Sequence, residues 1–195
     1  MKYRFRFVSF ILVISLLLSM ASLASAQSRT EVYGFYEGYR NFDYKTGGEG
    51  YPFILNAELN GGGGGIAYQY VPWFALFTQV SFLGTAMGDN LSARVINNLE
   101  GIRYSTPRYG PISFYGKGGV GFTNYSVVIT DLGEGGQTKF SAGYAGGAQI
   151  WATDYLGLFV EMQHLIMGVP NVFDAEGRDR WDSGLTYKTG LAIRF

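Results

Sequence analysis

The stretch LNGGGGGIAYQYVPWFALF, residues 59 to 77, contains five consecutive glycines, which are followed by a run of alternating apolar residues and aromatics. A phosphate-binding loop would need GxxxxGK[ST], or GxGxxG at the start of a helix, because backbone amides must converge on the anion. No lysine follows the glycines, and the one formal GxGxxG match, Gly116 to Gly121, leads into β-branched and aromatic residues. A flexible linker is the alternative, but no second domain flanks the run. The stretch therefore favours two strands joined at residues 71 to 73.

The first 26 residues have the pattern of a secretory signal peptide. MKYRFRFVSFILVISLLLSMASLASA has a basic start, an apolar stretch and an Ala-x-Ala ending, which predicts cleavage before Gln27. A retained membrane anchor is the alternative. After residue 26 no apolar run approaches the roughly 18 to 20 residues of a membrane helix. We therefore predict a signal peptide over 1–26 and one domain over 27–195.

Charge and composition argue against several kinds of partner. The signal carries three basic residues and no acid, so the mature chain has 15 − 3 = 12 basic against 15 acidic residues, a net charge of −3. Nucleic acid is therefore not an expected partner. The chain has no cysteine and a single histidine, His164, which excludes disulfides and leaves little for a metal site. We expect no metal, no cofactor and no catalytic residue.

Period-two alternation predicts eight strands, at 31–40, 62–71, 74–83, 94–105, 112–123, 140–151, 155–166 and 184–195. Short connections at 71–73, 106–111 and 152–154 alternate with long ones at 41–61, 84–93, 124–139 and 167–183. This alternation is typical of outer-membrane barrels, which have tight periplasmic turns and longer external loops. The sequence thus predicts an all-β fold, an eight-stranded antiparallel up-and-down transmembrane β-barrel with both termini in the periplasm.

Residue parity separates a lipid-facing from a lumen-facing set. In the last predicted strand, Leu185, Leu191 and Ile193 share one parity, and Lys188 and Arg194 the other. Glycines and tyrosines occupy both faces of 31–40, which leaves that strand's facing open. Glu100 has the same parity as its apolar neighbours Ile102 and Tyr104. Two explanations are open at this point, a bulge in the strand or a position at the end of the strand. The predicted polar network of the lumen is Glu37, Arg103, Lys117, Glu161, Lys188 and Arg194.

An eight-stranded barrel has an interior only wide enough to be filled by side chains. We therefore interpret the network as a polar plug, with a transport path or an acid-base site as the alternatives. Unpaired buried charges are costly, so Glu37 is expected to pair with Lys188, and Glu161 with Lys117 or Arg103. Trp73 and Trp151 lie beside short turns, which predicts an aromatic girdle at the periplasmic interface.

Residues 27 to 195 resemble the small outer-membrane β-barrel family of the OmpA/OmpX type. The ending TGLAIRF, with Gly190, Ile193 and a final Phe195, is similar to the signal read by the barrel-assembly machinery. EGIRYS (100–105), GKGGVGF (116–122) and YAGGAQIWATDYLGLFVEMQHL (144–165) are similar to the family's glycine-rich strand pairs. The resemblance implies a Gram-negative outer membrane, insertion from the periplasm, and contact with lipid and lipopolysaccharide. It implies no single activity.

The main functional hypothesis is a structural or interaction protein, monomeric by default and not an enzyme, with external loops available to an unidentified partner. One alternative is an outer-leaflet enzyme that modifies lipid A through His164. Asp182 and Ser183 lie near His164 in the predicted fold, but their spacing does not define a catalytic triad. We therefore favour a histidine at the membrane interface over a catalytic one. The other alternative is a soluble periplasmic barrel of lipocalin-like shape, which would need polar outer faces.

Overall fold

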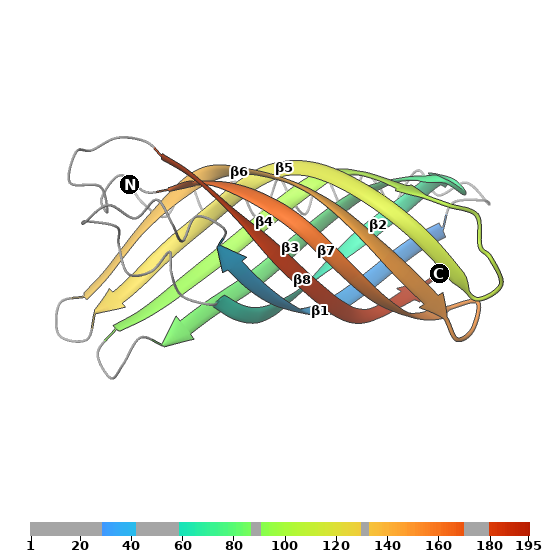
Figure 1. Ribbon diagram of the computed structural model, residues 1–195, viewed down its shortest axis with the longest axis horizontal. Coiled ribbons are helices and arrows are strands. Elements are labelled where there is room, and N and C mark those ends of the chain that lie inside the picture. Colours follow the sequence, from blue (N-terminus) through green and yellow to red (C-terminus); the bar gives the residue numbers. More distant parts are fainter. Residues whose placement is uncertain (1–28, 42–58, 87–90, 130–132, 170–179) are drawn as a thin grey trace.

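The computed structural model of the protein describes residues 29–41, 59–86, 91–129, 133–169 and 180–195. These residues form one closed barrel of antiparallel strands in which each strand pairs with its sequence neighbours and β1 pairs with β8 (Figure 1). Within them, no helix is both long and apolar enough to span a membrane. The predicted signal peptide lies outside the described residues. The strands are β1 (Arg29–Asn41), β2 (Leu59–Val71), β3 (Phe74–Ala86), β4 (Leu91–Ser105), β5 (Ile112–Ile129), β6 (Gly133–Trp151), β7 (Leu156–Val169) and β8 (Arg180–Arg194).

Two of the four connections predicted to be long are mostly strand. β3 and β4 pair as far as Ala86 and Ser92, and β5 and β6 pair as far as Ile129 and Gly133. The predicted loops at 84–93 and 124–139 are therefore wrong in extent. Alternation disappears where polar residues, glycines and the apolar run Val127 to Ile129 follow one another without a period of two. The backbone ladder continues there, so the sequence signal ends before the strand does. Residues 42–58 and 170–179, the centres of the other two long connections, lie outside the described residues.

The outer face of the barrel is apolar, unlike that of a soluble protein. Large apolar side chains on the outer parity are exposed, including Ile102, Val120 and Leu158, each 55% exposed. The alternate residues point inward and are buried, among them Glu37 and Gln163. The outer face therefore offers an apolar band, and the polar groups gather inside.

The five glycines of the opening stretch all lie within β2, opposite β1. Gly63 pairs with Phe35 and Gly65 with Tyr33, and both aromatic side chains are buried. A Cβ atom at Gly65 would lie 2.6 Å from the Tyr33 hydroxyl, and one at Gly63 would lie 2.7 Å from Phe35 Cζ. Gly63 and Gly65 leave room for these rings, and the β3 backbone is also close there, because a Cβ would lie 2.2 Å from Val80 O and 2.5 Å from Thr78 O, respectively.

The same arrangement recurs on other strands. Tyr115 on β5 pairs with Gly147 on β6, and a Cβ there would lie 2.5 Å from the tyrosine ring. Phe159 on β7 pairs with Gly190 on β8, where a Cβ would lie 2.9 Å from the phenyl ring. Rings laid over glycines thus fill the lumen between its charged groups.

Candidate functional site

The lumen charges lie toward the end of the barrel that carries the short connections, which we call the turn end. The opposite end is the loop end. Nearest the turn end, Glu31 accepts hydrogen bonds from Arg103 Nη1 at 2.6 Å and from Gln149 Nε2 at 2.8 Å, and Arg103 also bonds to Gln149. Arg194 Nη2 lies 3.1 Å from the other oxygen of Glu31. These four residues, from β1, β4, β6 and β8, form the turn cluster.

A second group of charges lies farther along the lumen. Lys117 Nζ lies 2.8 Å from Glu161 Oε2, and Lys188 Nζ lies 3.5 Å from Glu161 Oε1 and 3.6 Å from Glu37 Oε1. Both lysines also bond to glutamines, Lys117 to Gln79 at 2.6 Å and Lys188 to Gln163. The four charged residues form the central cluster, in which Glu161 is shared by two ammonium groups.

Aromatic side chains join the two clusters. The Arg103 guanidinium lies 4.1 Å above the Tyr115 ring, and the Tyr115 hydroxyl donates to Glu161 at 3.0 Å. Lys117 lies 5.0 Å from the centre of the Phe77 ring. The cavity between the clusters measures only about 10 Å³, close to the space that a single water molecule requires. The described part of the lumen is therefore filled at this depth.

All six residues of the predicted network lie in these clusters, and the structure contains the expected pairs Glu37–Lys188 and Glu161–Lys117. Arg103 pairs with Glu31 instead of Glu161. Glu31 is absent from the predicted network, although it shares the parity of Glu37 six residues later. That shared parity was the available signal.

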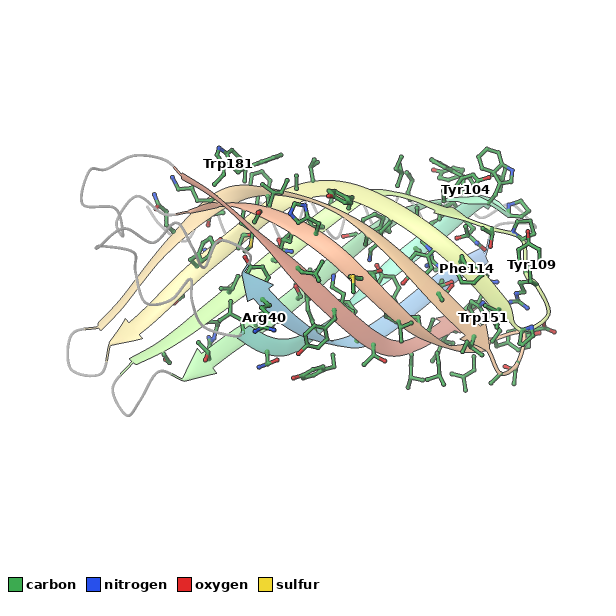
Figure 2. The ribbon with its side chains drawn as sticks, viewed as in Figure 1. Arg40, Tyr104, Tyr109, Phe114, Trp151 and Trp181 are labelled. Atoms are coloured by element: carbon green, nitrogen blue, oxygen red, sulfur yellow. The ribbon has the colours of Figure 1, made fainter. Side chains whose placement is uncertain are left out.

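Trp151 is not part of an outer girdle, so that prediction is wrong. The indole is 5% exposed, donates from Nε1 to Ser113 at 3.3 Å, and is covered by the Arg194 guanidinium at 4.0 Å. Trp151 has the same parity as the inward-facing Gln149, and parity decides the face. Figure 2 labels it at the turn end, at the end of the barrel opposite Trp181.

Trp73 does face outward at the turn end. It is 51% exposed, and its ring lies 5.7 Å from that of Tyr104 and 6.2 Å from that of Phe74. Toward the loop end, Phe140 lies between Phe122 and Trp181 on the outer face, at 6.3 and 6.2 Å. Aromatic groups thus occur toward both ends of the apolar band.

A cavity of about 540 Å³ opens at the turn end, between the connections at 71–73 and 106–111. Arg108 and Arg194 line it together with Gln69, Ser105 and Ser113. Arg108 is paired with the exposed Asp154 at 3.2 Å. The cavity is a mouth of the barrel and is separated from the loop end by the two charged clusters.

His164 lies on the outer face of β7, where it pairs with Tyr144 and Leu185. The His164 and Tyr144 rings are 5.1 Å apart. Ser183 pairs with Ile166, which makes it a diagonal neighbour of His164, whereas the Asp182 side chain lies outside the described residues. Among the described residues, no group of three or more acidic or histidine side chains is placed to hold a metal ion.

The C-terminal residues complete the seam between β8 and β1. Gly190 pairs with Phe35 inside the barrel, and Ile193 pairs with Val32 on the outer face. The Phe195 backbone N–H donates to the Thr30 carbonyl at 2.9 Å, and its side chain is 71% exposed. The ending that resembles an assembly signal therefore presents two apolar side chains outward.

Comparison with solved structures finds the same architecture in small barrels of bacterial outer membranes. Neisserial surface protein A is 9% identical with a TM-score of 0.60, over 86% of this chain and 95% of that one. The attachment invasion locus protein Ail of Yersinia pestis is 13% identical with a TM-score of 0.55, over 86% and 98%. A major outer membrane protein from Thermus thermophilus is 12% identical with a TM-score of 0.57, over 87% and 100%.

This chain has the fold of a small outer-membrane β-barrel. No protein-family model matches the sequence, and no curated protein matches it. At identities of 9 to 13% the likeness establishes the fold, and the activity has to be argued from the residues.

Proposed function

We propose that the protein is an integral outer-membrane β-barrel of structural or interaction type, without catalysis, whose lumen is a plug. The observation that carries this proposal is the filled interior beneath an apolar outer face. The turn cluster joins four strands around Glu31, and the central cluster joins four around Glu161 and Lys188. An open path would have to separate these buried ion pairs, which is costly.

The outer face supports anchoring in lipid. The exposed apolar residues include Leu158, Val160 and Met162 on β7 and Leu191 on β8, each more than half exposed. A soluble lipocalin-like barrel would cover such residues or replace them with polar ones, and its ligand would need an interior cavity of several hundred Å³. Among the described residues, the cavity between the two clusters measures about 10 Å³, and the larger one, of about 540 Å³ at the turn end, is lined by Arg108 and Arg194, which does not suit a small apolar ligand.

The loop end supports an interaction role. β5 and β6, at 18 and 19 residues, are the longest strands of the described chain and pair along the whole of β5. Figure 1 shows their hairpin projecting beyond the tip of β1. A paired hairpin loses less conformational entropy on binding than a loose loop, so we propose it as the surface that meets a partner.

The proposal is tested by expressing the full chain in a Gram-negative host and isolating outer membranes. A closed barrel should be recovered there and should migrate differently in SDS gels before and after boiling. Purified protein in planar bilayers should give no steady conductance. Recovery as a soluble periplasmic protein would contradict membrane anchoring, and a stable open current would contradict the plug.

The enzymatic alternative depends on His164, because it is the single histidine of the chain and Ser183 is its diagonal neighbour. We expect His164→Ala to leave the acyl composition of lipid A, measured by mass spectrometry, identical to that produced by the unmodified protein. Tyr144→Ala, which removes the neighbouring ring, is the matched control. An acyl change that requires His164 would replace the structural hypothesis with an enzymatic one.

A further inference from the structure

Glu100 lies on the outer face of β4, surrounded by lipid-facing residues. It pairs with Thr78 on β3 and with Val120 on β5, and the register of β4 with both strands is uninterrupted from Ser92 to Tyr104. A bulge is therefore excluded as the reason for its parity. Ile102 and Val120 beside it are both 55% exposed.

The depth of Glu100 follows from the strand geometry. Tyr104, beside Trp73 at the turn end, is four residues away on the same strand. At a tilt of about 45° and a rise of about 3.3 Å per residue, Glu100 lies roughly 9 Å farther along the barrel axis. The apolar band of such barrels is about 25 Å tall, so this places Glu100 close to the middle of the membrane.

Two other polar side chains flank Glu100 on the same face. Asn98 is the next outward residue of β4, and Thr78 is its direct partner on β3. Among the described residues, no ion pair is formed by Glu100. Hydrocarbon offers no hydrogen bonds, so polar groups at this depth are expensive unless another protein surface satisfies them.

Glycines on β5 make this face flat. Gly118 pairs with Ile102 and Gly116 with Tyr104, both on the outer parity. A Cβ atom at these glycines would meet nothing closer than 3.9 and 3.8 Å, so the barrel itself leaves room for a side chain at both positions. Small residues at such positions allow a second membrane-embedded surface to approach closely.

We propose that this Glu100 face, formed by Thr78, Asn98, Glu100, Gly116 and Gly118, is the interface of a homodimer in the membrane. The inference rests on the proposed membrane location and replaces the monomer expected from the sequence. Two copies related by a two-fold axis along the membrane normal present the same residues at the same depth. Each Glu100 can then accept from the partner copy's Asn98 amide and Thr78 hydroxyl, so the patch is complementary to itself.

The absence of cysteine allows a direct test, because an introduced thiol is the only one present. Val120→Cys places it beside Glu100. Leu191→Cys on β8, similarly exposed at 52% against 55%, places it on the far side of the barrel. Outer membranes are oxidised with a lipid-soluble catalyst and run on non-reducing gels. The dimer yield from Val120→Cys should exceed that from Leu191→Cys about tenfold, equivalent to ~1.4 kcal/mol of preference.

A second variant examines the role of the carboxylate. Adding Glu100→Leu to Val120→Cys removes a lipid-facing charge, so the barrel should still fold, and the dimer yield should fall to the level of Leu191→Cys. Equal yields at the two positions, or no effect of Glu100→Leu, would overturn the dimer while the boiling-dependent shift still reported a folded barrel. Cross-linking to a protein of another mass would also overturn it. Loss of the shift in the unmodified chain would overturn the membrane proposal as well.

Discussion

The two halves of the lumen are built from the same inward parity and differ in how they are held together. Toward the turn end, buried ion pairs join strands around the lumen, including β1 with β4 and β5 with β7, which are not neighbours in the barrel. Toward the loop end, the interior is mostly apolar, with a small hydroxyl group in which Thr123 and Ser141 both donate to Asn97. The buried apolar residues there are Leu83, Val95, Leu99, Leu165 and Met167, none more than 2% exposed.

The same inward parity therefore supports two kinds of stabilising interaction in one barrel, buried ion pairs in the turn half and apolar packing in the loop half. Removing one partner of a buried ion pair leaves an uncompensated charge, whereas removing an apolar side chain leaves a cavity. Variants in each half thus separate the electrostatic from the packing contribution.

The largest effect is expected from Glu161→Gln in the central cluster. It removes the carboxylate shared by Lys117 and Lys188, and the expected loss of unfolding free energy is about 4 kcal/mol. Urea titration of the protein in lipid vesicles measures it. The control is Asp154→Asn, which breaks the exposed pair with Arg108 and should cost less than about 1 kcal/mol. Similar losses from both variants would show that the central cluster does not hold the turn half together.

Leu165→Ala in the loop half should have the next largest effect. Leu165 is fully buried, and its truncation should cost about 3 kcal/mol by leaving a cavity. The same urea titration applies, with Ile166→Ala, the neighbouring outward residue of the same strand, as the control. If the outer variant were the more damaging, the loop half would be held by its lipid contacts and not by its interior packing.

A smaller loss is expected from Gly65→Ala, at the boundary where rings lie over glycines. The added methyl would meet the Thr78 backbone oxygen at 2.5 Å and the Tyr33 ring at 2.6 Å, and overpacking of this kind should cost about 2 kcal/mol. Gly34→Ala is the control, because a Cβ there would have its nearest neighbour at 3.9 Å. The two variants are compared by their urea midpoints. A neutral Gly65→Ala would mean that both the Tyr33 ring and the β3 backbone at Thr78 can move aside at little cost.

Strand number and most of the facing followed from residue alternation, because the pleat fixes side-chain direction residue by residue, although the facing of residues 31–40 was left open. The antiparallel order followed from the alternation of short and long connections. Glu100 and Trp151 show how strong the rule of residue alternation is. Glu100 faces outward, as its parity requires, although it is charged. Trp151 faces inward, as its parity requires, although it lies beside a short turn. The prediction for Trp151 failed because proximity to a short connection was given more weight than parity.

Other features of the site could not be read from one sequence. Arg103 pairs with Glu31 and not with Glu161 because of the stagger between strands that are distant in the barrel. That stagger depends on the register of every strand pair between them. The paired extensions of β5 and β6 left no apolar alternation to detect. The ring-over-glycine contacts likewise need the register.

The seam between the first and last strands carries two ion pairs that are also direct register partners. Glu31 faces Arg194 and Glu37 faces Lys188, so both strands space their charges by six residues. A slip of one residue would turn these side chains toward lipid, and a slip of two would keep the facing but misalign both pairs together. Correct closure of the seam therefore satisfies both ion pairs at once, whereas a shifted register satisfies neither. The seam joins the two strands farthest apart in the sequence, which makes it the least local pairing in the barrel.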